Sequence, residues 1–122
     1  MDNKEVIRKF YAEVFNGHDL AAAEKYIRND YIQHNPRVEN GLDGFKKFFT
    51  MMFARSPGFH FDIKRLIAED DYVVVHGNAT GTGISLGGAV VDIYRLENGR
   101  LAEHWDVLQQ VPETSVNGHT MF

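Results

Sequence analysis

The chain has 122 residues, a length that suits one compact domain and is too short for two. Hydrophobic residues make up 43% and charged residues 25% of it, which is ordinary globular composition, and the net charge of −4 offers no basic surface for nucleic acid or anionic membranes. The absence of cysteine excludes disulfides, thiol catalysis and cysteine-ligated metal.

The first half of the sequence predicts three helices. Apolar residues recur at helical spacing after a cap at residue 2 or 3 and indicate an amphipathic helix to about Phe15. A short helix is expected over residues 20–27, and residues 31–35 are expected to be extended, because Pro36 disfavours helix in the residue before it. The third helix begins near residue 42 or 43 and ends at the Ser-Pro-Gly of residues 56–58.

The second half predicts an antiparallel meander of four strands. The expected strands are residues 59–63, 72–82, 89–96 and 100–111, and a polar tail follows over 112–122. Asn98-Gly99 between the last two strands is typical of a two-residue type I′ hairpin. Helices followed by strands favour an α+β domain over residues 1–122, and the glycines at 77, 81, 87 and 88 favour a sheet that curls around the helices. A flat sheet over a filled core is the alternative.

Three stretches of the sequence resemble the SnoaL-like polyketide cyclase family of the NTF2-like superfamily. They are YIQHNP at 31–36, VDIYRLENGR at 91–100 and EHWDVLQ at 103–109, and the hairpin that ends in Glu-His-Trp-Asp is the most specific of them. The resemblance extends from the first helix to about Gln110, and the tail resembles a subgroup of SnoaL-like aldol-condensation enzymes. It implies an NTF2-like cone, with three N-terminal helices packed in a strongly curved, mostly antiparallel sheet, and no cofactor.

The resemblance makes Asp106 the first catalytic candidate, as the acid/base aspartate of the polyketide cyclases. Aldol closure removes a proton from the carbon beside a carbonyl, and a carboxyl group between apolar walls can both accept and donate that proton. The alternative is a solvated aspartate or one paired with arginine. His104 shares a face with Asp106 in an unbroken strand, so it either couples with it or packs against a helix.

Asp92 and His34 complete the expected catalytic set. The resemblance places Asp92 at a polar pocket position, but a two-residue Asn98-Gly99 loop pairs Asp92 with Trp105, so that regular alternation turns Asp92 and Asp106 to opposite faces of the sheet. Both line one pocket only if a bulge intervenes. His34 is expected at the cavity rim, where its imidazole could polarise a carbonyl oxygen or simply cap the segment before the proline.

The remaining expected site residues are those that would line the pocket and bind the substrate. They are Tyr31, Asn35, Phe49, Phe53, His76 and Trp105, with a core role as the alternative for the aromatic residues and for His76. Arg95 and Glu103 are expected to form a structural ion pair across the hairpin. The loop at 83–88 is shorter than in the polyketide cyclases, which argues against the ring-sized substrate of those enzymes.

Three functions remain open from the sequence. The first is a cofactor-independent lyase or isomerase that transfers a proton next to a carbonyl of a small apolar ligand, and the second is a non-catalytic binding or dimerisation module of the same fold. The third is a metal enzyme that uses His34, His76 and His104 with an aspartate, although their spacing matches no familiar metal motif. The resemblance also implies a homodimer formed through the outer sheet face, with Trp105 or Tyr94 as anchor.

Location and other partners follow from absences in the sequence. No apolar run approaches the ~20 residues that cross a bilayer, and the first five residues lack the layout of a signal peptide, so a cytoplasmic protein without membrane or nucleic-acid partners is expected. The glycine-rich stretches at 81–83 and 87–88 lack the strand-to-helix setting of a nucleotide-binding loop.

Overall fold

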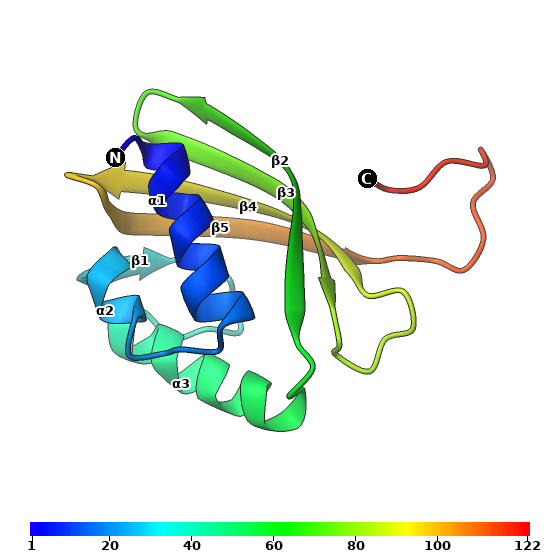
Figure 1. Ribbon diagram of the computed structural model, residues 1–122, viewed down its shortest axis with the longest axis horizontal. Helices are drawn as coiled ribbons and strands as arrows, with labels where there is room; N and C mark the ends of the chain where they lie inside the picture. The colour runs from blue at the N-terminus through cyan, green and yellow to red at the C-terminus, as the bar shows by residue number, and fades with distance from the viewer.

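A curved five-stranded sheet holds all the helices on its concave face in the computed structural model, which describes residues 1–122 (Figure 1). The helices are α1 (Asn3–Phe10), its π-helical continuation η1 (Tyr11–Asn16), α2 (Ala23–Tyr26) and α3 (Gly41–Arg55). The strands are β1 (Ile27–Gln33), β2 (His60–Glu69), β3 (Tyr72–Thr80), β4 (Gly88–Glu97) and β5 (Arg100–Gln110). The α+β order expected from the sequence is confirmed.

The first helix forms where the sequence predicts it. The side chain of Asp2 caps α1 by accepting a hydrogen bond from the Glu5 amide at 2.9 Å, which satisfies one of the free N–H groups of the first turn. Its apolar stripe, continued into η1, packs against the sheet and is almost fully enclosed: Val6, Ile7, Phe10, Tyr11 and Val14 are all 3% exposed or less. Burial of this stripe fixes the helix in the cone.

The sheet order is β1-β5-β4-β3-β2, and its four C-terminal strands form the expected antiparallel meander. The fifth strand, β1, pairs parallel with β5 at the sheet edge and begins at Ile27, inside the stretch expected to end the second helix. Only Ile27 and Tyr31 of this strand are buried, and their separation of four residues imitates a helix rather than the alternation of a strand. Its partner also lies some 70 residues away, so no local pattern shows the pairing.

Register shifts in the β2–β3 and β4–β5 pairs, together with one glycine, curve the four antiparallel strands. The β2–β3 register shifts between Ile63 and Arg65, and the β4–β5 register shifts between Arg95 and Leu96. Gly77 faces the concave side, where a Cβ atom would lie 2.3 Å from the Phe61 ring, so only glycine lets that ring pack so close to β3. The Asn98-Gly99 turn has positive φ at both residues, 52° and 75°, as a type I′ hairpin requires.

The segment after β5 projects beyond the end of the sheet and then turns back, so that the C-terminus points toward β2 and β3 (Figure 1). The Phe122 ring lies 5.8 Å from the His76 ring, and Lys64 Nζ lies 5.4 Å from the centre of the Phe122 ring. The tail therefore contacts the outside of the cone. No helix of the structure has the length and apolar character that would let it cross a membrane.

Candidate active site

One cavity of about 150 Å³ lies between the concave face of the sheet and the helices. Thirteen of its 18 lining residues are hydrophobic, and they include aromatic residues from η1, α3, β1, β2 and β4. Its five other lining residues are Gln33, Asn35, Asp92, His104 and Asp106. An apolar cavity with a few convergent polar groups is the usual form of a small-molecule site.

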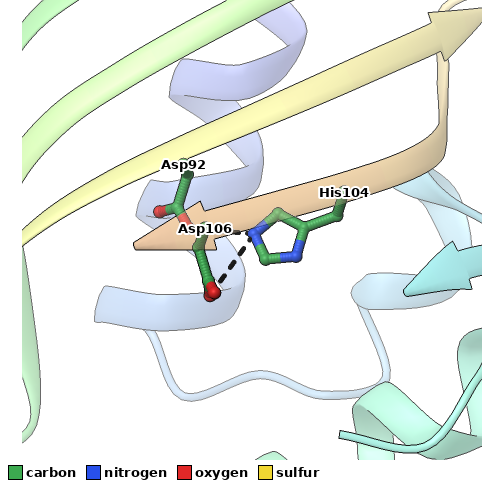
Figure 2. A group of neighbouring side chains, drawn as sticks. All are labelled: Asp92, His104 and Asp106. Atoms are coloured by element: carbon green, nitrogen blue, oxygen red, sulfur yellow. Dashed lines mark hydrogen bonds and ion pairs between the residues drawn. The ribbon is translucent and has the colours of Figure 1, made fainter. Parts of the chain in front are cut away.

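The bulge in β5 brings the two aspartates together. Glu97 pairs with Arg100 next to the turn, but after the register shift Asp92 pairs directly with Asp106, instead of with Trp105 as regular alternation predicts. The extra residue, Ala102, reverses the facing of everything that follows it on β5 relative to β4. Asp92, His104 and Asp106 therefore all point into the cavity (Figure 2).

Asp106 is the carboxylate with the most open access to the cavity. Its side chain is 20% exposed, whereas those of Asp92 and His104 are 8% exposed. The side-chain Nδ2 of Asn35 donates to both Asp106 oxygens, at 2.9 and 3.0 Å. A carboxylate offers about four acceptor positions, so this clamp fixes its orientation and leaves each oxygen able to accept a proton from a ligand.

His104 lies between two acceptors. Its Nδ1 is 2.7 Å from Gln33 Oε1, and its Nε2 is 2.9 Å from Asp92 Oδ1. Gln33 Oε1 also accepts a hydrogen bond from the backbone N–H of Asn35 at 3.0 Å. Because a backbone N–H needs an acceptor, this atom of the Gln33 side chain is the oxygen and not the nitrogen. His104 therefore carries its proton on Nδ1, and a second proton lies between Nε2 and Asp92, so this pair is neutral as a unit.

Two buried tyrosines hold the far side of Asp92. The Tyr11 hydroxyl donates to Asp92 Oδ2 at 2.5 Å and lies 2.8 Å from the Tyr94 hydroxyl. Burial, followed by the negative charge of Asp92, raises the pKa of both phenols well above the ordinary value of 10. Both remain neutral donors, and Asp92 is satisfied from two directions.

The structure places three expected site residues on the convex face, outside the cavity. His34 stacks on Trp105, with ring centres 4.8 Å apart and planes 5° from parallel, and its Nε2 is 2.7 Å from Glu103 Oε2. His76 contacts Arg65 and the Phe122 ring. The expected places of His34 at the rim and of His76 and Trp105 in the wall are corrected, since strand alternation turns all three outward.

Some aromatic residues of α3 line the cavity and others pack outside it. Phe49 lines the cavity with Tyr31, as expected. Phe53 does not reach it and stacks on His18, with ring centres 4.2 Å apart. Tyr94 faces inward and is 1% exposed, which removes it as a dimer anchor and leaves Trp105 on the outer face.

The expected ion pair between Arg95 and Glu103 is present, with Arg95 Nε 2.9 Å from Glu103 Oε1. The hydrogen bond from His34, followed by that from Arg95, lowers the pKa of the Glu103 carboxyl. A depressed carboxyl pKa stabilises the fold fully above the unfolded value of about 4.3, and this stabilisation is lost as the pH falls through the folded pKa.

We therefore expect Glu103→Gln to lower the free energy of unfolding by about 1 kcal/mol at pH 7, because the pair is only partly shielded from water. Urea unfolding of the wild type and the variant at pH 7, 5 and 3 measures the difference, which should shrink towards zero at the lowest pH. A difference of constant size across this range would contradict the assignment.

A metal ion would find three ligand atoms in the cavity. One atom each of Asp92, His104 and Asp106 lies within 4.8 Å of the others. The histidines expected as ligands are not brought together, since His34 and His76 lie on the opposite face from His104. An ion would also displace the proton between His104 and Asp92, so the contacts favour a proton-sharing pair.

The sequence interpretation missed Gln33, Tyr11 and Tyr94 as site residues. Gln33 lies between Tyr31 and Asn35 at a spacing of two, so extending the strand alternation from Tyr31 would have found it. The same spacing relates Tyr94 to Asp92. Tyr11 carries no such signal, because it reads as one more member of an apolar helix stripe.

The curved sheet around its helices, with a polar and aromatic cavity between them, defines the protein class as an α+β cone of the NTF2-like type. The sequence profile of the SnoaL-like polyketide cyclases matches residues 5–114. The chain belongs to the SnoaL-like polyketide cyclase family, which confirms the resemblance and agrees with a small-molecule ligand. No protein of curated function matches the sequence.

Solved structures share this fold over most of the chain. A candidate polyketide cyclase from Acidithiobacillus ferrooxidans is 24% identical with a TM-score of 0.76, and the match covers 88% of each chain. An uncharacterised cystatin-fold protein from Novosphingobium aromaticivorans is 25% identical with a TM-score of 0.76, covering 88% of this chain and 98% of that one. A loop-truncated variant of IdmH, a candidate polyketide cyclase from Streptomyces antibioticus, has a TM-score of 0.78 at 20% identity, covering 88% and 93%.

Proposed function

We propose that this protein is a cofactor-independent enzyme that transfers a proton next to a carbonyl group of a small apolar compound, in an aldol-condensation, cyclase or isomerase reaction. The observation that carries the proposal is the Asp106 carboxylate, held by Asn35 at the polar end of an aromatic cavity. The fixed orientation aims the carboxylate at one atom of the ligand.

In the proposed step, an Asp106 oxygen accepts the proton from the carbon beside the carbonyl. The electron pair of that C–H bond becomes the carbon–carbon π bond, and the carbonyl π pair moves to oxygen, which gives an enolate. The same carboxyl then returns the proton, or the enolate carbon attacks a second carbonyl. His104 Nε2 lies 3.8 Å from Asp106 Oδ2, so the neutral His104–Asp92 pair borders the base without neutralising it.

Deuterium exchange tests this proposal without knowledge of the natural substrate. We expect the protein to accelerate exchange of the protons beside the carbonyl of cyclohexanone in D₂O, in proportion to protein concentration and with saturation by the ketone. Proton NMR measures the loss of those signals against a buffer control. Saturable binding of the ketone without any faster exchange would support the non-catalytic binding module instead.

We also propose that the protein forms a homodimer through the convex face of the sheet. Apolar side chains gather there in the open: Ile67, Tyr72 and Val107 are 59%, 43% and 68% exposed, and Tyr72 lies beside Trp105. Contiguous apolar surface of this kind marks interaction sites, and a second copy offers a matching face. Light scattering should give twice 13.9 kDa, and a mass near one chain would refute the dimer.

A further inference from the structure

One polar side chain of the cavity makes no hydrogen bond within the protein. The Tyr31 side chain, on β1, is 1% exposed and lines the cavity, yet its hydroxyl makes no hydrogen bond within the chain. Each of the other polar side chains of the wall bonds at least one neighbour, through Gln33–His104–Asp92–Tyr11–Tyr94 and Asn35–Asp106. Asn78 Oδ1 is the one fully enclosed unpaired side-chain atom, so the Tyr31 oxygen keeps access to the cavity space.

The Tyr31 hydroxyl is a donor and not a base. Burial, followed by the negative charges of Asp92 and Asp106, raises its pKa well above 10. A buried hydroxyl without a partner costs free energy, so the position is unfavourable for folding alone. A group of this kind, aimed into a cavity, is explained by a ligand that supplies the missing acceptor.

The size and charge of the cavity restrict that ligand. Its 150 Å³ is the volume of a protein cavity that binds benzene, so it accommodates one small ring. No lysine or arginine lines it. Because the His104–Asp92 pair is neutral as a unit, the carboxylate of Asp106 leaves the cavity with a net negative charge. An anionic ligand is therefore disfavoured.

We propose that the Tyr31 hydroxyl binds the carbonyl oxygen of the ligand, and that this ligand is an uncharged carbonyl compound the size of one six-membered ring. The inference rests on the proposed function, because it places the ligand oxygen at Tyr31 while the adjacent carbon faces Asp106. Tyr31 keeps its own proton in the step and stabilises the negative charge that develops on the enolate oxygen.

The experiment uses cyclohexanone with a ¹³C-labelled carbonyl, titrated into wild type, Tyr31→Phe and Tyr72→Phe. A hydrogen bond to the oxygen moves the carbonyl ¹³C signal downfield, so the bound signal of Tyr31→Phe should lie upfield of the wild-type one, with about 3- to 10-fold weaker binding, the worth of one hydrogen bond. Tyr72→Phe removes a hydroxyl from the convex face and should match the wild type. Benzoate should bind more weakly than cyclohexanone.

Stability separates a ligand-binding role from a structural one. Tyr31→Phe removes an unpaired hydroxyl without leaving a partner behind, so its melting temperature should equal or exceed that of the wild type. A lowered melting temperature, an unchanged carbonyl signal, or no saturable binding of cyclohexanone to the wild type would each overturn the inference, the unchanged signal indicating that Tyr31 binds water only.

A further variant distinguishes failure of this inference from failure of the proposed function. In Asp106→Asn the downfield carbonyl signal should persist, because the donor at Tyr31 is intact. If the wild type shows that signal but no faster deuterium exchange, the carbonyl site stands and the proposed catalysis fails. If exchange is fast but the signal does not depend on Tyr31, the proposed catalysis stands and the carbonyl site at Tyr31 fails.

Discussion

Asp106→Asn is expected to slow the deuterium exchange of cyclohexanone by about 10²- to 10⁴-fold, the usual contribution of a positioned general base. An amide has the shape of the carboxyl group but accepts no proton from carbon at neutral pH. The fold should persist, because the change weakens only one of the two contacts from Asn35, at a cost of about 1 kcal/mol. The rate of NMR signal loss, at matched protein concentration, measures the effect.

The matched control is Glu103→Gln. Glu103 lies three residues earlier on the same strand, and its side chain bonds Arg95 and His34 on the convex face. The substitution removes one carboxylate from β5 without touching the cavity, so exchange should stay within twofold of the wild-type rate. Equal loss of activity in both variants would show that the strand, and not the Asp106 carboxyl, is responsible. Full activity of Asp106→Asn would refute its role as the base.

His104→Leu is expected to lower the free energy of unfolding by about 3 to 5 kcal/mol, the usual cost of breaking a buried pair by removing one partner. The variant leaves Asp92, which is 6% exposed, with Tyr11 as its one remaining hydrogen-bond donor. Urea unfolding monitored by circular dichroism measures the loss. His60→Leu, at an exposed position on β2, is the control and should change stability by no more than about 0.5 kcal/mol.

A double-mutant cycle tests whether His104 and Asp92 act as one unit. Asp92→Leu alone should also destabilise the fold, because it leaves the His104 ring and the Tyr11 hydroxyl facing an apolar group. The double variant should lose about 1 to 3 kcal/mol less unfolding free energy than the sum of the two single-variant losses, as for residues in direct contact. Additive losses would mean that the two side chains do not stabilise one another.

Much of the fold could be predicted from interactions between residues that are close in sequence. The capped helix at the N-terminus, the Asn98-Gly99 hairpin and the β-branched strands each depend on neighbours within a few residues, so their patterns were readable. The strand β1 was not, because its partner is distant and only two of its residues, Ile27 and Tyr31, are buried. The same limit applied to Tyr11, whose hydroxyl finds Asp92 from 81 positions away.

The sequence by itself determined the class of fold and which residue types could do acid/base work at Asp106 and His104. It left open which sheet face encloses them. One additional residue at the β5 bulge decided that, because a strand alternates with period two and a single insertion reverses the facing of everything beyond it relative to its partner. Tertiary structure alone thus put Asp92 beside Asp106, turned His34, His76 and Trp105 outward, and left the Tyr31 hydroxyl facing the cavity without a partner.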